Sequence, residues 1–219
     1  MFAQVLKAQW LQGRVIVALF LVLAFAVPLG SVLYGGDLGT ASGENVAAWL
    51  SMSKTVGQVI PVLALSLGVL MGMAAWAPDH AGRHVYALSL PIPRGHYVLL
   101  RFAAGLTLLA IPVAGLGLGA MIASYAVKLP SGIHAYPLQL TVRFGLSATV
   151  MYAIFFAISI GTKRAVIATL GAVGGVLLAD LLRTALGDEP IVVSWVFGVL
   201  TTWPGPLAIL LGRWALFDV

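Results

Sequence analysis

The sequence predicts an all-α integral membrane protein, built as a single transmembrane domain over residues 1–219. Three observations support this prediction: 61% of the residues are hydrophobic, only 9% are charged, and the apolar residues occur in long runs. A soluble domain carries about 25% charged residues, so a water-soluble fold does not account for this composition. A membrane-spanning helix needs about 20 consecutive apolar residues, and several runs reach that length.

Six apolar runs predict six transmembrane helices. They cover approximately residues 15–34, 56–77, 98–127, 138–161, 164–182 and 191–216. The apolar stretch 138–182 is too long for one crossing of a hydrocarbon core about 30 Å thick, so we expect a tight turn at 161–164. In the last run Pro204 and Pro206 remove backbone donors, which predicts one kinked or broken span.

A short amphipathic helix is predicted before the first span. Phe2, Leu6 and Trp10 recur at helical spacing, with Lys7 on the other face. This pattern is typical of a helix that lies in the headgroup plane of a membrane. The alternative, that this segment is an extension of the first span, stays open. The first apolar run is longer than the core of a signal peptide, so we expect it to be retained.

The basic residues predict the orientation in the membrane. With the N-terminus inside, the cytoplasmic ends collect Lys7, Arg14, Arg83, Arg94, Arg101, Lys163, Arg164 and Arg213, and the outer ends collect Lys54, Lys128, Arg143 and Arg183. Lys and Arg are enriched in cytoplasmic loops, so both termini are expected in the cytoplasm. The membrane is expected to be the cytoplasmic membrane of a bacterium or an archaeon. The net charge of +5 then indicates contacts with membrane lipids rather than with nucleic acid.

Glycines four residues apart recur in three of the predicted spans. The pairs are Gly68 and Gly72, Gly115 and Gly119, and Gly171 and Gly175. Glycine lets two helix backbones approach closely, which is how helices associate in lipid. Helix packing within one subunit and a seam or path between subunits are both open uses of these pairs.

Several kinds of chemistry have no support in the sequence. The chain has no cysteine, which excludes disulfides, thiol catalysis and cysteine-based metal sites. It has no P-loop motif, so ATP would have to be bound by another protein. His80, His84 and His96 are not accompanied by further ligands at metal spacing. We therefore expect neither a catalytic site nor a metal or cofactor in this chain.

The polar segment 78–97, between the second and third spans, is the most informative part of the sequence. Asp79 is predicted to cap a short cytoplasmic helix that ends at the Pro-Ile-Pro break of residues 91–93. Leu88 would contribute to an apolar face and Arg83 to a basic rim. A short helix of this kind suits a docking contact with another protein, although it would also suit the membrane surface.

This segment resembles the corresponding loop of type-2 ATP-binding-cassette (ABC) exporter permeases. In that family an acidic residue, a glycine and a Leu-x-Leu-Pro-Val/Ile-x-Arg element recur between the second and third spans. The matching positions in this chain are Asp79, Gly82, Arg83, Leu88, Pro91 and Arg94. The six predicted spans and the interfacial helix also fit the family. Histidines follow the acidic position here, where the family commonly has a more highly charged run.

The resemblance implies the permease subunit of an ATP-driven exporter. Such a subunit pairs with a second copy or a paralogue, and with separate ATPase subunits that bind ATP and Mg²⁺. The loop helix would be the coupling helix, seated in a cleft of the ATPase. Two alternatives remain: a non-transporting membrane assembly or immunity-type protein, and an ion-coupled secondary transporter. The second would need charged residues near mid-span, where the predicted spans have none.

Overall fold

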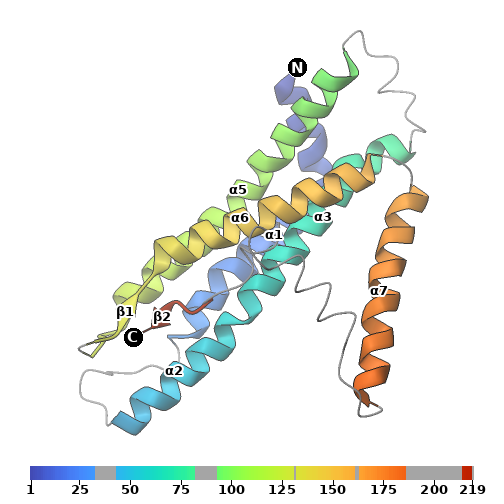
Figure 1. Ribbon diagram of the computed structural model, residues 1–219. Helices are drawn as coiled ribbons and strands as arrows, with labels where there is room; N and C mark the ends of the chain where they lie inside the picture. The colour runs from blue at the N-terminus through green and yellow to red at the C-terminus, as the bar shows by residue number, and fades with distance from the viewer. Residues whose placement is uncertain (33–42, 82–92, 131, 161–162, 186–213, 219) are drawn as a thin grey trace.

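Long apolar helices form the body of the structure, a computed structural model that describes residues 1–32, 43–81, 93–130, 132–160, 163–185 and 214–218 (Figure 1). The described elements are α1 (Phe2–Gly30), α2 (Gly43–Gly57), α3 (Val59–Ala81), α5 (Arg94–Ala126), β1 (His134–Ala135), α6 (Pro137–Ser159), α7 (Lys163–Ala185) and β2 (Phe217–Asp218).

Within the described residues, five helical stretches are long and apolar enough to cross a membrane. They are Phe2–Gly30, Asn45–Ala77, Arg94–Ala126, Pro137–Ser159 and Ile167–Ala185. The prediction of an all-α membrane protein is therefore confirmed, and five of the six predicted spans overlap these stretches. The sixth predicted span, 191–216, lies outside the described residues except for its last positions. The stretch Asn45–Ala77 contains the junction of α2 and α3, close to Pro61, whose missing N–H weakens a continuous helix there.

The N-terminal segment is part of the first long helix. α1 runs without a break from Phe2 to Gly30, so the separate interfacial helix predicted from the sequence is wrong and the segment extends the first span. No proline occurs before Pro28, and Gly13 is accommodated within the helix, where the Met71 side chain packs against it. Helix formation therefore propagates through the whole segment, because no proline interrupts it and the packing around Gly13 offsets the weak helix propensity of glycine.

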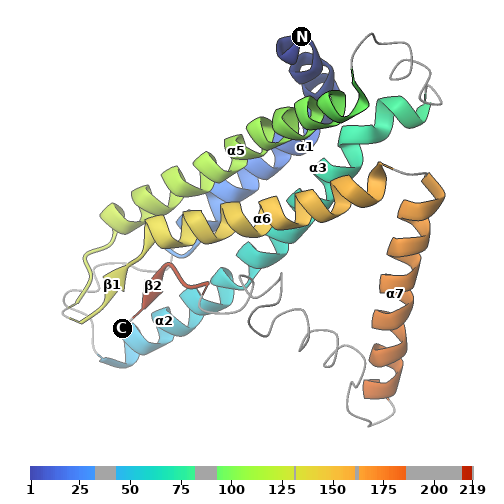
Figure 2. The same ribbon diagram turned by 45° about the horizontal axis from the view of Figure 1, so that its top comes forward.

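α1, α3, α5 and α6 lie side by side as a bundle (Figures 1 and 2). Gly115 and Gly119 of α5 pack against Leu21 and Phe25 of α1 respectively, so α1 and α5 run in the same direction. Gly68 of α3 packs against Ala148 of α6, and Gly72, one turn later in α3, packs against Phe155 and Phe156. The contacts advance in the same direction along both helices, so α3 and α6 are also parallel to each other. Two of the three glycine pairs therefore serve contacts within the chain.

The third glycine pair is in a different environment. A Cβ atom added at Gly171 or Gly175 would have nothing within 4 Å among the described residues. Both glycines belong to α7, which diverges from the bundle after the turn that follows α6 (Figures 1 and 2). The predicted turn at 161–164 agrees with the end of α6 at Ser159 and the start of α7 at Lys163, although residues 161 and 162 lie outside the described part.

A small sheet closes one end of the bundle. β1 and β2 pair antiparallel, with His134 opposite Asp218 and Ala135 opposite Phe217. The Phe217 side chain is fully buried, and its ring centroid lies 4.9 Å from that of Trp49 in α2. Residues 214–218 therefore lie beside α2 and the connection between α5 and α6.

The sequence predicts that both termini are cytoplasmic, and the positions of the two chain ends within the bundle provide a test of that prediction. The N-terminus lies at the other end of the bundle from β2 (Figure 1). The prediction counted six crossings from apolar length, whereas the contact that holds Phe217 and Asp218 joins residues distant in the sequence. Which end of the bundle faces the cytoplasm remains a prediction from the basic residues.

We expect the two termini to be accessible from opposite sides of the membrane. The chain has no native cysteine, so single cysteines can be introduced as Ala3→Cys and as a residue added after Val219. A membrane-impermeant thiol reagent applied to intact cells should label only the C-terminal cysteine, if the N-terminus is cytoplasmic as the basic residues predict. Lys128→Cys, at the same end as β2, is the positive control. Protection of both terminal cysteines until the cells are permeabilised would contradict this arrangement.

The contact of α3 with α6 predicts a contrast between two glycines. A Cβ at Gly68 would lie 2.5 Å from the carbonyl oxygen of Ala148, so Gly68→Ala must push the helices apart. We expect a loss of about 1–3 kcal/mol in stability, measured as a lower thermal unfolding midpoint in detergent. The matched control Gly30→Ala, where an added Cβ would have nothing within 4 Å among the described residues, should leave the midpoint unchanged or raise it, because alanine favours a helix. Equal effects of the two substitutions would refute the packing described for α3 and α6.

Candidate functional site

A buried ion pair lies at the end of the bundle where α3 ends and α5 begins. Asp79, near the end of α3, pairs with Arg101 of α5, and the two side chains are only 3% and 4% exposed. Tyr97 completes the group, because Arg101 Nη1 donates a hydrogen bond to its hydroxyl over 2.8 Å. The Tyr97 hydroxyl in turn donates to Asp79 Oδ2 over 3.3 Å. Each charge is thereby compensated in an environment where an isolated charge would be strongly disfavoured.

Two aromatic rings lie close to the guanidinium of Arg101. The Arg101 guanidinium carbon lies 5.1 Å from the centre of the Trp76 ring and 5.3 Å from that of Tyr97, within the range of cation–π attraction. Trp76 also donates a hydrogen bond from Nε1 to the backbone oxygen of Phe156 over 3.1 Å. Through Trp76 the ion pair is thus connected to α6 as well as to α3 and α5.

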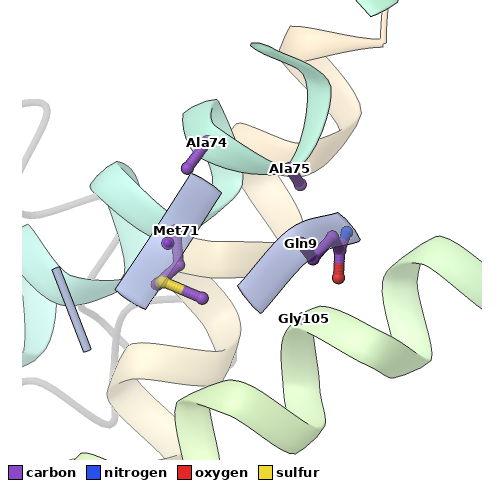
Figure 3. A pocket seen from close by; sticks show the side chains of 6 residues that line it. Gln9, Met71, Ala74, Ala75 and Gly105 are labelled. Carbon is purple, nitrogen blue, oxygen red and sulfur yellow. The ribbon is translucent and has the colours of Figure 1, made fainter. Parts of the chain in front are cut away.

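Gln9 connects α1 to the same group. Its Nε2 donates a hydrogen bond to the backbone oxygen of Arg101 over 3.0 Å. Gln9 also lines a cavity of about 10 Å³, enough for about one water molecule, together with Gly13, Met71, Ala74, Ala75 and Gly105 (Figure 3). Gln9 Oε1 is buried and has no hydrogen-bond partner among the described residues. We refer to Gln9, Trp76, Asp79, Tyr97 and Arg101 as the polar joint.

Tyr152 of α6 supports the polar joint from within the bundle. Its hydroxyl donates a hydrogen bond to the backbone oxygen of Phe102 over 3.2 Å, and its ring stacks on that of Phe102 at 5.2 Å between centroids. The Tyr152 hydroxyl also occupies the place that a side chain at residue 105 would need, which explains the glycine there. α1, α3, α5 and α6 are therefore fixed to one another at this end.

The depth of the polar joint in the membrane can be inferred from the exposed residues of α1. Gln9, which contacts Arg101, precedes Arg14 by five residues, a helical rise of about 7.5 Å. The exposed apolar residues of α1 continue from Val15 through Leu19 to Val22. The polar joint therefore lies at the boundary of the apolar belt, on the side of the N-terminus, and not near its middle.

The predicted site residues differ in where they lie: one is buried, one is exposed and the others are outside the described residues. Asp79 was predicted to cap a short helix, but it lies inside α3 and its side chain is turned into the bundle. The burial of an unpaired carboxylate would be costly, so the contact with Arg101 determines its position. Arg94 is the first residue of α5 and is exposed. The predicted coupling helix, with Gly82, Arg83, Leu88 and Pro91, lies outside the described residues.

The sequence held signals for part of the polar joint. Tyr97 and Arg101 are four residues apart and share a helix face, and opposite charges at 79 and 101 flank the loop. Gln9 continues the buried stripe formed by Gly13 and Val17 of α1, so it is a polar residue in a core position. In the part of the chain that the structure describes, no three His, Asp or Glu side chains gather as a metal ion would require.

The site and the fold together define a multi-pass helical membrane protein with a buried ion pair at one end of its bundle. No family model, no curated protein and no solved structure matches the chain.

The ion pair predicts a large effect from removal of either charge alone. Arg101→Met leaves the Asp79 carboxylate buried without its partner, and we expect a loss of about 3–5 kcal/mol in stability. Asp79→Leu combined with Arg101→Met removes both charges and should recover most of that loss. The unfolding midpoint in detergent is the measurement.

Arg94→Met is the matched control for this prediction, because Arg94 lies on the same helix but is exposed. It should leave the unfolding midpoint unchanged. An Arg101→Met variant as stable as Arg94→Met would show that the ion pair does not hold α3 and α5 together.

Proposed function

We propose that this chain is the membrane-spanning permease subunit of an ATP-driven ABC exporter. In this proposal the segment 78–97 contacts a separate ATPase subunit, which binds ATP and Mg²⁺, while this chain has no catalytic role. The sequence resemblance of that segment to the coupling loop of type-2 permeases is the origin of the proposal. The observation that supports it most is the polar joint, because it connects the ends of this segment to the bundle.

The polar joint gives a mechanical reason for the proposal. Asp79 and Arg101 lie on either side of residues 82–92, so a displacement of that segment is passed to α3 and α5 together. Gln9 passes the displacement on to α1, and Trp76 passes it on to α6. A nucleotide-driven movement of an ATPase would therefore move four helices as a unit, instead of being absorbed by a flexible connection.

A second permease subunit, identical or paralogous, is part of the proposal. Of the three glycine pairs in the sequence, two are occupied by contacts between helices of this chain. The pair Gly171 and Gly175 has open space around it among the described residues. Glycines with such space favour close contact with another helix in lipid, and α7 is therefore where we place the second subunit.

An ion-coupled secondary transporter is the second candidate function, and one observation favours it. A buried carboxylate such as Asp79 is a usual feature of proton relays in membrane proteins. Two features favour the exporter over it: Asp79 is neutralised by Arg101, and the pair lies at the boundary of the apolar belt. Relays and substrate sites of secondary transporters lie near the bilayer midplane.

Co-purification tests the exporter proposal. The tagged chain, isolated from its native host in mild detergent, should carry an ABC ATPase identified by mass spectrometry. Leu88→Asp should abolish this association, because a carboxylate would face the apolar cleft of the ATPase. Leu138→Asp, an equally drastic change on an exposed position of α6 at the far end of the bundle, should retain it.

Two other results of the co-purification would contradict the proposal or part of it. Absence of an ATPase from the wild-type preparation, while other membrane complexes survive, would refute the exporter proposal and favour the transporter or assembly alternatives. Recovery of the ATPase with Leu88→Asp would show that Leu88 is not part of the docking contact.

A further inference from the structure

The first half of α1 carries a cationic face that points away from the bundle. Lys7 and Arg14 are exposed and lie seven residues apart, close to two full helical turns, so they share one side of the helix. Trp10 lies between them and is 41% exposed. Gln9 and Gly13, on the opposite side, are buried against α5 and α3. The orientation of the two cations is therefore fixed by the packing of the same helix.

The same face becomes apolar further along α1. Ala18 is exposed and lies 11 residues after Lys7, which brings it back to the same side of the helix. Val15, Leu19 and Val22 are exposed as well. Residues that face water would be polar, so this part of the helix faces lipid. The cations thus lie just beyond the lipid-facing part of the helix. The two residues are about 10 Å apart along the axis, and their long side chains can reach toward the same headgroup layer.

The charges of these two residues are not neutralised within the described protein. Neither Lys7 nor Arg14 forms a salt bridge with a described residue, and the sequence has no Asp or Glu before Asp37. Asp79, the described carboxylate at this end of the bundle, is engaged by Arg101. This face of α1 is therefore complementary in charge to an anionic partner.

We propose that Lys7, Trp10 and Arg14 form a binding surface for the headgroup of an anionic phospholipid. The ammonium of Lys7 and the guanidinium of Arg14 would donate hydrogen bonds to phosphate oxygens, and Trp10 has the amphipathic ring typical of the interface. The apolar face around Ala18 would contact the acyl chains. This inference does not depend on the exporter proposal, because it concerns the lipid-facing side of α1.

Lipid-specific quenching tests the surface in the full-length protein. Because the chain has no native cysteine, Ala18→Cys can carry a single fluorophore on the same side as Lys7 and Arg14. The labelled protein is placed in phosphatidylcholine nanodiscs that contain a small fraction of a quencher-bearing lipid, either phosphatidylglycerol or phosphatidylcholine. Both faces of a nanodisc have the same composition, so the orientation of the protein does not affect the result.

We expect phosphatidylglycerol to be enriched around the label by about fivefold or more over phosphatidylcholine at low ionic strength. The enrichment should fall at about 1 M salt, where charges are screened within about 3 Å. Lys7→Gln combined with Arg14→Gln should abolish it, whereas the charge-preserving exchange of Lys7→Arg with Arg14→Lys should retain it.

Two results would overturn the proposal. One is equal quenching by the two lipids in the otherwise wild-type protein, which needs no further variant to be interpreted. The other is an unchanged preference for phosphatidylglycerol after both cations are replaced by glutamine, in a variant that still elutes as a single species.

Discussion

The buried pair of Asp79 and Arg101 is the constraint on which the arrangement of the helices depends. Neither charge is tolerated alone in an apolar interior, so α3 and α5 must meet at the one level where the two side chains touch. A buried ion pair adds little net stability compared with apolar residues of the same size. Its effect is to exclude other registers, because a shift of one turn would leave both charges without a partner. Gln9 and Trp76 connect α1 and α6 to the same group, so the registers of four helices are set at this one end of the bundle.

Away from the polar joint, close packing between the helices maintains their register along the bundle. Lipid tails are as apolar as leucine, so burial in a membrane gives helices little reason to associate, and backbone proximity has to supply it. Gly68 and Gly72 serve the contact of α3 with α6, while Gly115 and Gly119 serve that of α5 with α1. The two sets of contacts are complementary: the polar group selects the register, and the glycines supply attraction along the helices.

The sequence predicted what depends on local composition and missed what depends on distant partners. The runs at 98–127 and 138–161 correspond closely to α5 and α6, because apolar length is a property of each segment alone. The position of Asp79 was wrong, since a capping residue and a buried ion-pair partner have the same local signature before Arg101 is brought alongside. Gly68 and Gly171 likewise belong to identical motifs, yet only Gly68 meets another helix among the described residues. The pairing of Phe217 with Ala135 has no local signal at all.

The contact between β2 and the region around α2 also determines the order in which the molecule can be completed during synthesis. Trp49 and Lys54 emerge from the ribosome well before Phe217 and Asp218, which they contact, and translation adds about 5–20 residues per second. The end of the bundle around Arg101 can assemble once α6 has been inserted, whereas the opposite end must wait on the order of ten seconds or more for its closing segment. During that interval Trp49 and its neighbours are open to chaperones, proteases and other nascent helices. A ribosome stalled before residue 214 would leave a half-closed bundle, a distinctive substrate for membrane quality control.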